Sequence, residues 1–221
     1  MTTRIPRRTA ATAPWRHGAR QQRSRRTEDA LSRAALRLLR ERPFEQIRVE
    51  DLTSRANVAV GTFYRRFRDK RAVLHLADMG FVNDCLAAFD AAMSDERMRS
   101  RSLEEIVTAY ITVMVTKFRE HRAEILQVIR HADAGDAGEY AARAQAFNTH
   151  VHGRFRELLR RHVSTMTHPS LETALNLAIF FASAAARDAV WRGNLRAYPI
   201  ALDDARLIAE LTRAFVAYLR S

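Results

Sequence analysis

The sequence predicts an all-α protein, and three observations lead to that fold class. Apolar residues recur at spacings of three and four along most of the chain, and no stretch of useful length alternates as a strand does. No proline falls between Pro43 and Pro169, which favours long helices. Two short helical patterns flank a bend between residues 48 and 67. We expect about nine helices, forming an N-terminal three-helix domain with a helix-turn-helix and a C-terminal helical domain.

The composition is typical of a soluble globular protein, but the charge is unusual. Hydrophobic residues make up 47% and charged residues 28% of the chain, with a net charge of +12. That charge favours a polyanionic partner, with nucleic acid ahead of membrane. The single cysteine, Cys85, fits a reducing compartment, and the longest apolar run, Leu177 to Ala186, is shorter than the ~20 residues that span a bilayer. We therefore expect a cytoplasmic, nucleoid-associated protein without a membrane partner.

The N-terminal residues 1–24 are predicted to form a disordered, arginine-rich arm. Residues 1–26 contain eight arginines and no acidic residue. Pro6, Pro14 and Gly18 discourage regular structure, and no apolar stretch is long enough for the core of a signal peptide. Two roles stay open for the arm. It is either a solvated extension or an addition to the DNA contacts at phosphates or the minor groove.

The DNA-binding domain is predicted to span residues 25–75. Its first helix begins near Thr27, a suitable N-cap, with Glu28 and Asp29 in the first turn. An amphipathic stripe follows and can cover the back of the helix-turn-helix, until Pro43 ends the helix. The residues of the stripe are Leu31, Ala34, Ala35, Leu38 and Leu39.

The helix-turn-helix motif is predicted at residues 48–67. The first piece, Val49–Arg55, carries a narrow apolar stripe and two acidic residues in its first turn. Asn57 accepts a left-handed backbone more readily than most residues, so it can form the bend without a glycine. The second piece, Val60–Phe67, is anchored inward by Phe63 and turns hydroxyl and guanidinium groups outward. A short helix of this kind suits a DNA groove.

The run from Thr27 to Leu74 resembles the N-terminal domain of the TetR family of bacterial transcriptional regulators. The resemblance is most specific in GTFYRRFRDKRAVL at residues 61–74, which joins a Gly-Thr-aromatic-Tyr core to a Phe-x-Asp-Lys exit. Two positions depart from the family pattern. Ala59 stands where a Ser or Thr N-cap is usual, a loss of about 1 kcal/mol of helix stability. Arg48 stands where Thr is common, and it can reach a phosphate but cannot cap a helix.

The second piece of the motif offers several contacts to DNA. The guanidinium groups of Arg65 and Arg66 can pair with O6 and N7 of guanine or bind phosphate instead. Val60 can pack on a thymine methyl or face the core, and Gly61 lets the backbone approach the sugar-phosphate chain closely. By resemblance, three further positions contact phosphates, namely Thr62, Tyr64 and Lys70.

Residues 76–221 are predicted to form the effector-binding and dimerisation domain. A helix capped by Asp69 should run to about Met93 and link this domain to the DNA reader. Ser102 and Glu105 form a capping box at the start of another helix, and Asp203-Asp204 opens the last one.

The last two helices are predicted to form a subunit interface. The segment from Leu171 to Trp191 is apolar over most of its circumference, so it must be buried on more than one side. A partner subunit can supply that burial, and an ordinary intramolecular core is the alternative. The resemblance supports a homodimer, because the family pairs through a four-helix bundle and binds a pseudo-palindromic operator with recognition helices ~34 Å apart. The predicted interface residues are Leu175, Ile179, Ala182, Ala186, Leu211 and Phe215.

The resemblance also implies an unidentified small-molecule effector, whose binding inside the C-terminal domain releases DNA. Each aromatic residue offered as a pocket wall could instead be part of the core. The predicted walls are Tyr110, Met114, Phe118, Phe147, Phe155 and Phe180, and the candidate polar contacts are Arg130, His131 and His150.

Other chemistries find little support in the sequence. No nucleophile elbow, Cys/His metal array or phosphate-binding glycine loop is present, so we expect no enzyme activity and no cofactor. His150 and His152 are two residues apart, which points them in different directions on a helix, so we expect no metal site. The predicted function is a ligand-responsive homodimeric repressor, with activation as an alternative. A helical module whose DNA reader has decayed is the rival hypothesis, supported only by Ala59 and Arg48.

Overall fold

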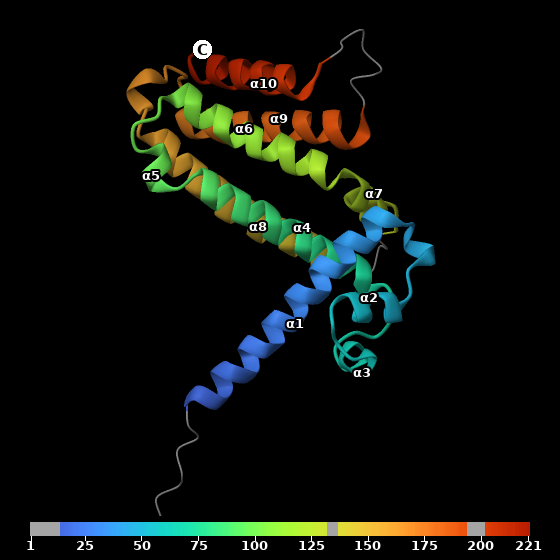
Figure 1. The fold of residues 1–221 in the computed structure, drawn as a ribbon. Coiled ribbons are helices and arrows are strands. Elements are labelled where there is room, and N and C mark those ends of the chain that lie inside the picture. The colour runs from blue at the N-terminus through green and yellow to red at the C-terminus, as the bar shows by residue number, and fades with distance from the viewer. Residues whose placement is uncertain (1–13, 132–136, 194–201) are drawn as a thin grey trace, which may run out of the picture.

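The computed structural model describes residues 14–131, 137–193 and 202–221 (Figure 1). Within these ranges the protein is built from ten α-helices with short 3-10 and π-helical turns, and it contains no strand. The helix-turn-helix lies at one end of the molecule, and three stacked helices, α6, α9 and α10, lie at the other. The predicted all-α class, with a helix-turn-helix N-terminal domain and a helical C-terminal domain, is confirmed.

The first helix, α1, starts earlier than the sequence suggested. It runs from Pro14 to Glu41, so our prediction of a start near Thr27 is wrong, and residues 14–24 are helical where we predicted disorder. Proline is well suited to the first position of a helix, because its φ is already helical and it lacks only an N–H that would find no partner. The arginines and glutamines that follow have good helix propensity, which outweighs the cost of one glycine. The rest of the predicted arm, residues 1–13, lies outside the described residues.

The N-terminal core gathers side chains from six segments. These are α1, the 3-10 turn η1 (Phe44–Gln46) with the residue after it, α2 (Val49–Arg55), α3 (Val60–Tyr64), the first half of α4 (Ala72–Ala92) and α7 (Arg122–His131). The predicted stripe of α1 is buried as expected and faces α4. The core includes Leu31, Leu38, Leu39, Ile47, Leu52, Phe63, Val73, Leu74 and Leu76.

Helix α4 belongs to both halves of the molecule. Its N-terminal half carries Val73 and Leu76 into the N-terminal core, and its C-terminal half carries Phe89 into the core of the bundle. Among the described helices only α4 is long and apolar enough to span a bilayer, but it packs against α1, α6, α7 and α8, as a core helix does. It crosses α1 at Gly80, where an added Cβ would lie 2.7 Å from Leu36 Cδ1. The glycine therefore lets the two helices approach closely.

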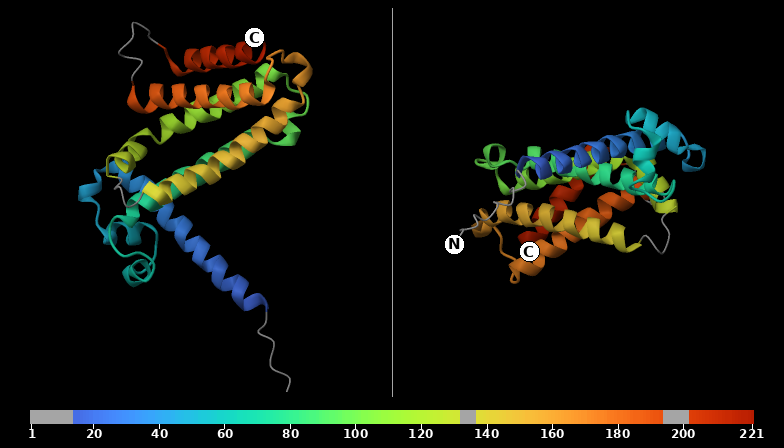
Figure 2. Two further views of the ribbon diagram at one scale, coloured as in Figure 1. Left: turned by 180° about the vertical axis from the view of Figure 1, so that it is seen from behind. Right: turned by 90° about the horizontal axis from the view of Figure 1, so that it is seen from below.

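The C-terminal helices form a bundle whose long members lie side by side (Figure 2). The caps predicted at Ser102 and Asp203 are confirmed, because the Ser102 hydroxyl accepts from the Glu105 N–H at 3.2 Å and Asp203 Oδ1 accepts from the Arg206 N–H at 2.8 Å. Asp69, predicted to cap α4, is not its N-cap, because that helix begins at Ala72 after Arg71. The elements, in order, are α5 (Asp95–Met98), α6 (Leu103–Glu120), α7 (Arg122–His131), α8 (Ala137–Arg160), η2 (Val163–Thr165), α9 (Leu171–Arg187), the π-helical turn η3 (Asp188–Arg192) and α10 (Asp204–Leu219).

The residues predicted for the subunit interface lie largely inside their own chain. Leu175, Ile179 and Ala186 are at most 2% exposed and belong to the bundle core, so their assignment to an interface is wrong. The reason is that α9 packs against both α6 and α10 of the same chain, and these helices use the face that we assigned to a partner. The remaining three, Ala182, Leu211 and Phe215, line a groove between α9 and α10.

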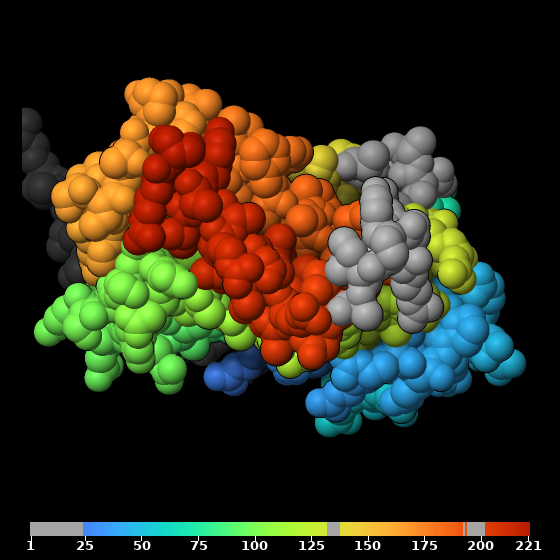
Figure 3. All heavy atoms as spheres, turned by 90° about the horizontal axis from the view of Figure 1, so that it is seen from above, coloured from blue at the N-terminus to red at the C-terminus, as the bar shows by residue number. Residues whose placement is uncertain are grey.

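Part of the outer surface of α9 and α10 is apolar. The two helices lie on the face of the bundle that is seen from above in Figure 3. Phe180 is 59% exposed and Phe181 51% exposed, and Leu177 lies on the same helix at 37%. Phe181 also lines the groove of about 210 Å³, together with Tyr218 of α10. We call Leu177, Phe180, Phe181 and Tyr218 the outer apolar face.

Candidate functional site

The bend of the helix-turn-helix has the predicted geometry. Asn57 has φ of +53°, the only positive φ of a non-glycine residue in the described ranges, and the Val58 N–H donates to the Thr53 carbonyl at 2.9 Å. At the start of α2, the Arg48 N–H donates to Asp51 Oδ2 at 2.9 Å. The carboxylate at the third helical position thus satisfies the Arg48 N–H, which is the half of a capping box that does not need an N-cap side chain.

The recognition helix α3 is short and firmly anchored. It ends at Tyr64 rather than at Phe67 as we predicted, although the Phe67 N–H still donates to the Phe63 carbonyl at 3.0 Å. Phe63 is fully buried, and its ring lies 5.0 Å from that of Phe67. Because a single buried aromatic residue holds the helix, the rest of its surface stays available to solvent.

Four of the predicted DNA contacts are exposed on α3 and at the residue that follows it, namely Val60, Gly61, Tyr64 and Arg65. Tyr64 is 53% exposed and Val60 is 37% exposed, which decides against the core-facing alternative for Val60. Arg65 is exposed and has one contact, from its Nη2 to Thr62 Oγ1 at 3.1 Å. A Cβ added to Gly61 would meet no atom within 4 Å. The fold therefore does not require a glycine at this position.

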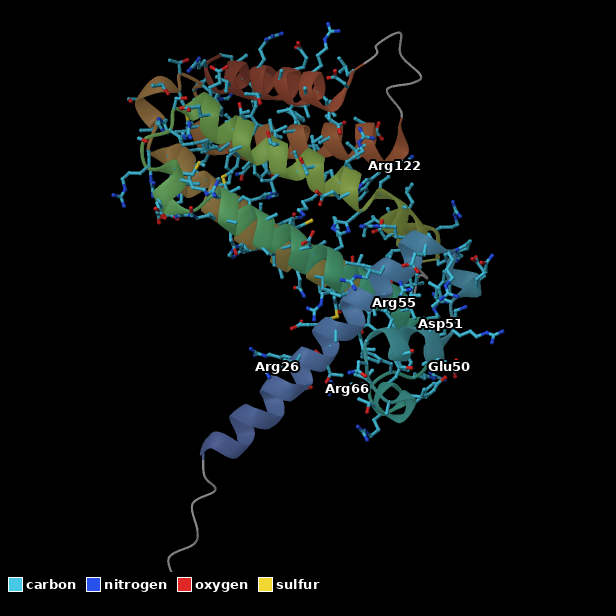
Figure 4. The ribbon with its side chains drawn as sticks, viewed as in Figure 1. Arg26, Glu50, Asp51, Arg55, Arg66 and Arg122 are labelled. Carbon is cyan, nitrogen blue, oxygen red and sulfur yellow. The ribbon has the colours of Figure 1, made fainter. Side chains whose placement is uncertain are left out.

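Two of the predicted DNA contacts are bound within the protein. Arg66 Nη1 donates to Ser24 Oγ at 2.9 Å and to Glu28 Oε1 at 3.0 Å, both on α1 (Figure 4). Lys70 Nζ donates to the Glu45 carbonyl at 2.8 Å. The Arg66 guanidinium is thus engaged by a carboxylate rather than held out toward a base. Arg65, which directly follows α3, faces solvent.

A cavity of about 100 Å³ lies between α4, α6, α8 and α9. Four of the six predicted pocket residues line it, namely Tyr110, Met114, Phe118 and Phe147. Phe155 does not line it but stacks on Tyr110 at 4.0 Å. Phe180 is exposed on the outer apolar face, so its assignment as a pocket wall is wrong.

The polar groups of the cavity are not the ones that we predicted. Arg130, His131 and His150 do not line it, and His150 Nε2 contacts Asp90 Oδ1 at 2.8 Å on the surface instead. The polar lining missed from the sequence consists of Lys117, Asn148, His152, Ser183 and Arg187. Periodicity could not identify these side chains, because each lies at the edge of an otherwise amphipathic helix.

Burial keeps three ionisable groups of the cavity lining neutral, namely Cys85, Tyr110 and His152. It raises the pKa of the Cys85 thiol to about 12, and it raises the pKa of Tyr110 to about 12 against a hydrogen bond with Ser183. Burial, helped by Arg156, lowers the pKa of His152. The thiol, the phenol and the imidazole therefore act as neutral polar groups, and the fixed charges of the lining are the cations Lys117 and Arg187.

One cluster in the described part of the chain has the composition of a metal site. The ligand atoms of Asp84, Glu120 and His121 lie within 4.8 Å of one another. The Lys117 ammonium lies among them, 2.9 Å from Asp84 Oδ2 and 2.7 Å from Glu120 Oε2. A lysine ammonium thus already supplies the positive charge that the two carboxylates require.

An exposed recognition helix, a left-handed bend and a separate helical bundle define a helix-turn-helix transcriptional regulator. The family model described as "Bacterial regulatory proteins, tetR family" matches residues 31–77, and the one described as "Tetracyclin repressor-like, C-terminal domain" matches residues 102–219. The second match alone covers more than half of the chain. The chain therefore belongs to the TetR family of DNA-binding transcriptional regulators, and it is not an enzyme.

Solved structures of similar fold include other regulators. A TetR regulator from Rhodococcus sp. RHA1 has 18% identity and a TM-score of 0.58, covering 89% of this chain and 97% of that one. FadR from Bacillus subtilis, solved with stearoyl-CoA, has 15% identity and a TM-score of 0.56, covering 87% and 97%. RolR, solved with resorcinol, has 19% identity and a TM-score of 0.50, covering 90% of each chain. No curated protein matches the sequence.

Proposed function

We propose that this protein is a homodimeric repressor that binds a pseudo-palindromic operator and leaves it when a small molecule binds. The observation that carries the proposal is the surface of α3. Phe63 is fully buried and fixes the helix, while Tyr64 and Val60 are exposed beside a glycine that the fold does not need. Such a surface allows a close approach of the DNA backbone and leaves an aromatic hydroxyl and Arg65 to make contacts.

The outer apolar face supports the homodimer. Exposed side chains of this size are uncommon in a cluster on a monomeric protein, and a two-fold partner would cover them with the same surface. Two copies of α9 and α10 would form a four-helix arrangement, as in relatives of the family. The interface would then consist of Phe180, Phe181 and the groove residues rather than the buried side of α9.

Ligand response is supported by the cavity in the bundle. FadR and RolR, which share the fold, were solved with stearoyl-CoA and with resorcinol. The cavity adjoins α4 through Cys85 and Phe89, and α4 also forms part of the N-terminal core. A ligand in this cavity would contact α4, the helix that also packs in the core of the DNA-binding domain. Repression is the simplest outcome, because a dimer on an operator blocks polymerase by occupying the site.

DNA binding is tested by fluorescence anisotropy with the intergenic DNA upstream of the coding sequence, over a range of salt concentrations. We expect sequence-selective binding that weakens steeply as salt rises, because phosphate contacts release counterions. Tyr64→Ala should weaken binding to every sequence, and Arg65→Ala should also reduce the preference for the operator. Binding that is absent, or insensitive to salt, would instead favour a helical module without DNA function.

The dimer is tested by analytical ultracentrifugation of Phe180→Glu and Phe181→Glu. We expect the wild type to sediment as a dimer and each variant to shift toward monomer. Ile129→Glu is the matched control, because Ile129 is 55% exposed but lies on α7, away from the outer apolar face. A dimer that survives both Phe variants would show that a different surface forms the interface.

A further inference from the structure

The cavity between α4, α6, α8 and α9 has an uneven charge. Its lining contains two permanently charged cations, Lys117 and Arg187, and no aspartate or glutamate. Tyr110 and His152 are neutral, and the carboxylates that pair with Lys117, from Asp84 and Glu120, are not part of the lining. The excess positive charge of the lining therefore lies on Arg187, and it favours an anion at that end of the cavity.

The two cations differ in their existing partners. Lys117 is bound to Asp84 at 2.9 Å and to Glu120 at 2.7 Å, and its side chain is only 18% exposed. Arg187, in the last turn of α9, is exposed and makes no ion pair with a carboxylate of the described residues. Its guanidinium is therefore available, and its planar fork can bind both oxygens of a carboxylate.

The apolar part of the lining determines which non-polar group of a ligand the cavity favours. Four aromatic rings line the cavity, from Phe89, Tyr110, Phe118 and Phe147, together with Val113, Met114 and Val151. Rings of this kind favour another ring in edge-to-face or offset stacking. The volume of about 100 Å³ is smaller than a cavity of ~150 Å³ that holds benzene, so a ligand of at most one ring fits, after the lining side chains move slightly. A long acyl chain would not fit without opening the bundle.

We propose that this cavity binds a small aromatic carboxylate, with its ring among the four aromatic side chains and its carboxylate on Arg187. Asn148 and His152 provide hydrogen-bonding groups within the same lining. The proposal rests on the proposed function in one respect, because the ligand is an effector only if the protein is a ligand-responsive regulator. It concerns binding to the free protein, which can be measured without DNA.

Isothermal titration calorimetry of the full-length chain with benzoate tests the proposal. Benzyl alcohol has the ring without the charge, and acetate has the charge without the ring. We expect benzoate to bind more tightly than either, and Arg187→Gln to weaken benzoate by about tenfold or more while leaving benzyl alcohol unchanged. Arg206→Gln is the matched control, an exposed arginine of α10 that does not line the cavity.

Three results would overturn the assignment: no heat of binding with benzoate at millimolar concentration, equal affinity for benzoate and benzyl alcohol, or full benzoate affinity in Arg187→Gln. These results do not depend on the regulator hypothesis. Operator binding without benzoate binding would reject the ligand class and keep the repressor. Benzoate binding without operator binding would keep the ligand class and reject the repressor.

Discussion

The DNA-binding end and the C-terminal bundle place their aromatic and polar side chains in opposite ways. At the DNA-binding end, one buried ring, Phe63, anchors a helix whose other side chains face solvent. In the bundle, the polar groups Lys117 and Arg187 line a cavity among aromatic rings. The comparison shows two ways of offering a binding surface. At the DNA-binding end the side chains point outward from a small core, whereas in the bundle they line a cavity within a larger core.

The largest expected effect tests whether the two cores fold together. Phe63→Ala and Phe155→Ala each remove a fully buried ring, and each should cost about 3–5 kcal/mol of unfolding free energy. Because α4 contributes to both cores, we expect a single denaturant transition in each variant, followed by circular dichroism. Ile129→Ala, at an exposed position, should change stability by less than about 0.5 kcal/mol. Two separate transitions would mean that the cores are independent.

The next comparison sets two glycines against each other. At Gly80 an added Cβ would press on Leu36 and lie 3.1 Å from the Ser32 carbonyl, so Gly80→Ala should lower stability by about 1–3 kcal/mol. At Gly61 there is open space, so Gly61→Ala should leave stability equal or higher by up to about 1 kcal/mol while weakening DNA binding. Thermal unfolding and anisotropy measure the two quantities. Unimpaired DNA binding in Gly61→Ala would contradict the close approach.

A smaller effect is expected from the helix cap at the start of α6. Ser102→Ala removes the hydroxyl that accepts from the Glu105 N–H, and this should cost about 1 kcal/mol in urea unfolding. Thr112→Ala is the control, because Thr112 is exposed on the same helix and its hydroxyl bonds only a carbonyl of the preceding turn. Equal losses in the two variants would remove the capping argument.

The most gradual effect is a pH dependence at the junction of the two regions. Burial opposes protonation of His121, but its contacts with Glu124 and Asp84 outweigh burial and raise the pKa above the ordinary 6.5. The protonated imidazole therefore stabilises the fold. This contribution is complete below pH 6.5 and is lost as the pH rises through the higher folded-state pKa.

Chemical unfolding between pH 6 and pH 9 should accordingly show stability falling with pH. His121→Asn should flatten that slope. The carboxylate of Glu124 remains paired with Arg40 in the variant, so the buried acid keeps a cationic partner. A slope that persists unchanged in His121→Asn would assign the titration to another group.

Local signals in the sequence predicted much of this structure. The bend at Asn57, the cap at Ser102 and the C-terminal end of α4 each depend on residues within a few positions of one another, and all three are as predicted. The start of α1 was missed, because proline and glycine were interpreted as breakers when Pro14 is instead the first residue of the helix. Propensity alone does not distinguish these two uses of proline.

The parts of the site that were missed depend on distant neighbours. Arg66 is held by Glu28, 38 positions earlier in the chain, so its orientation was not readable from the motif. The core-facing side of α9 was assigned to a partner, because a helix that is apolar all round does not reveal which neighbour covers which face. Lys117 and Arg187 come together at the cavity only through the packing of α6 and α9.

The position of Gly80 near the middle of α4 limits how that helix can move. Rotation of α4 about its own axis would withdraw Val73 from one core and Phe89 from the other, so this motion is opposed at both ends. Tilting about the closest point to α1 disturbs less, because the two ends then move in opposite directions around a fixed centre. We therefore expect α4 to tilt about this crossing, so that a small displacement beside the cavity would produce an opposite displacement beside the recognition helix.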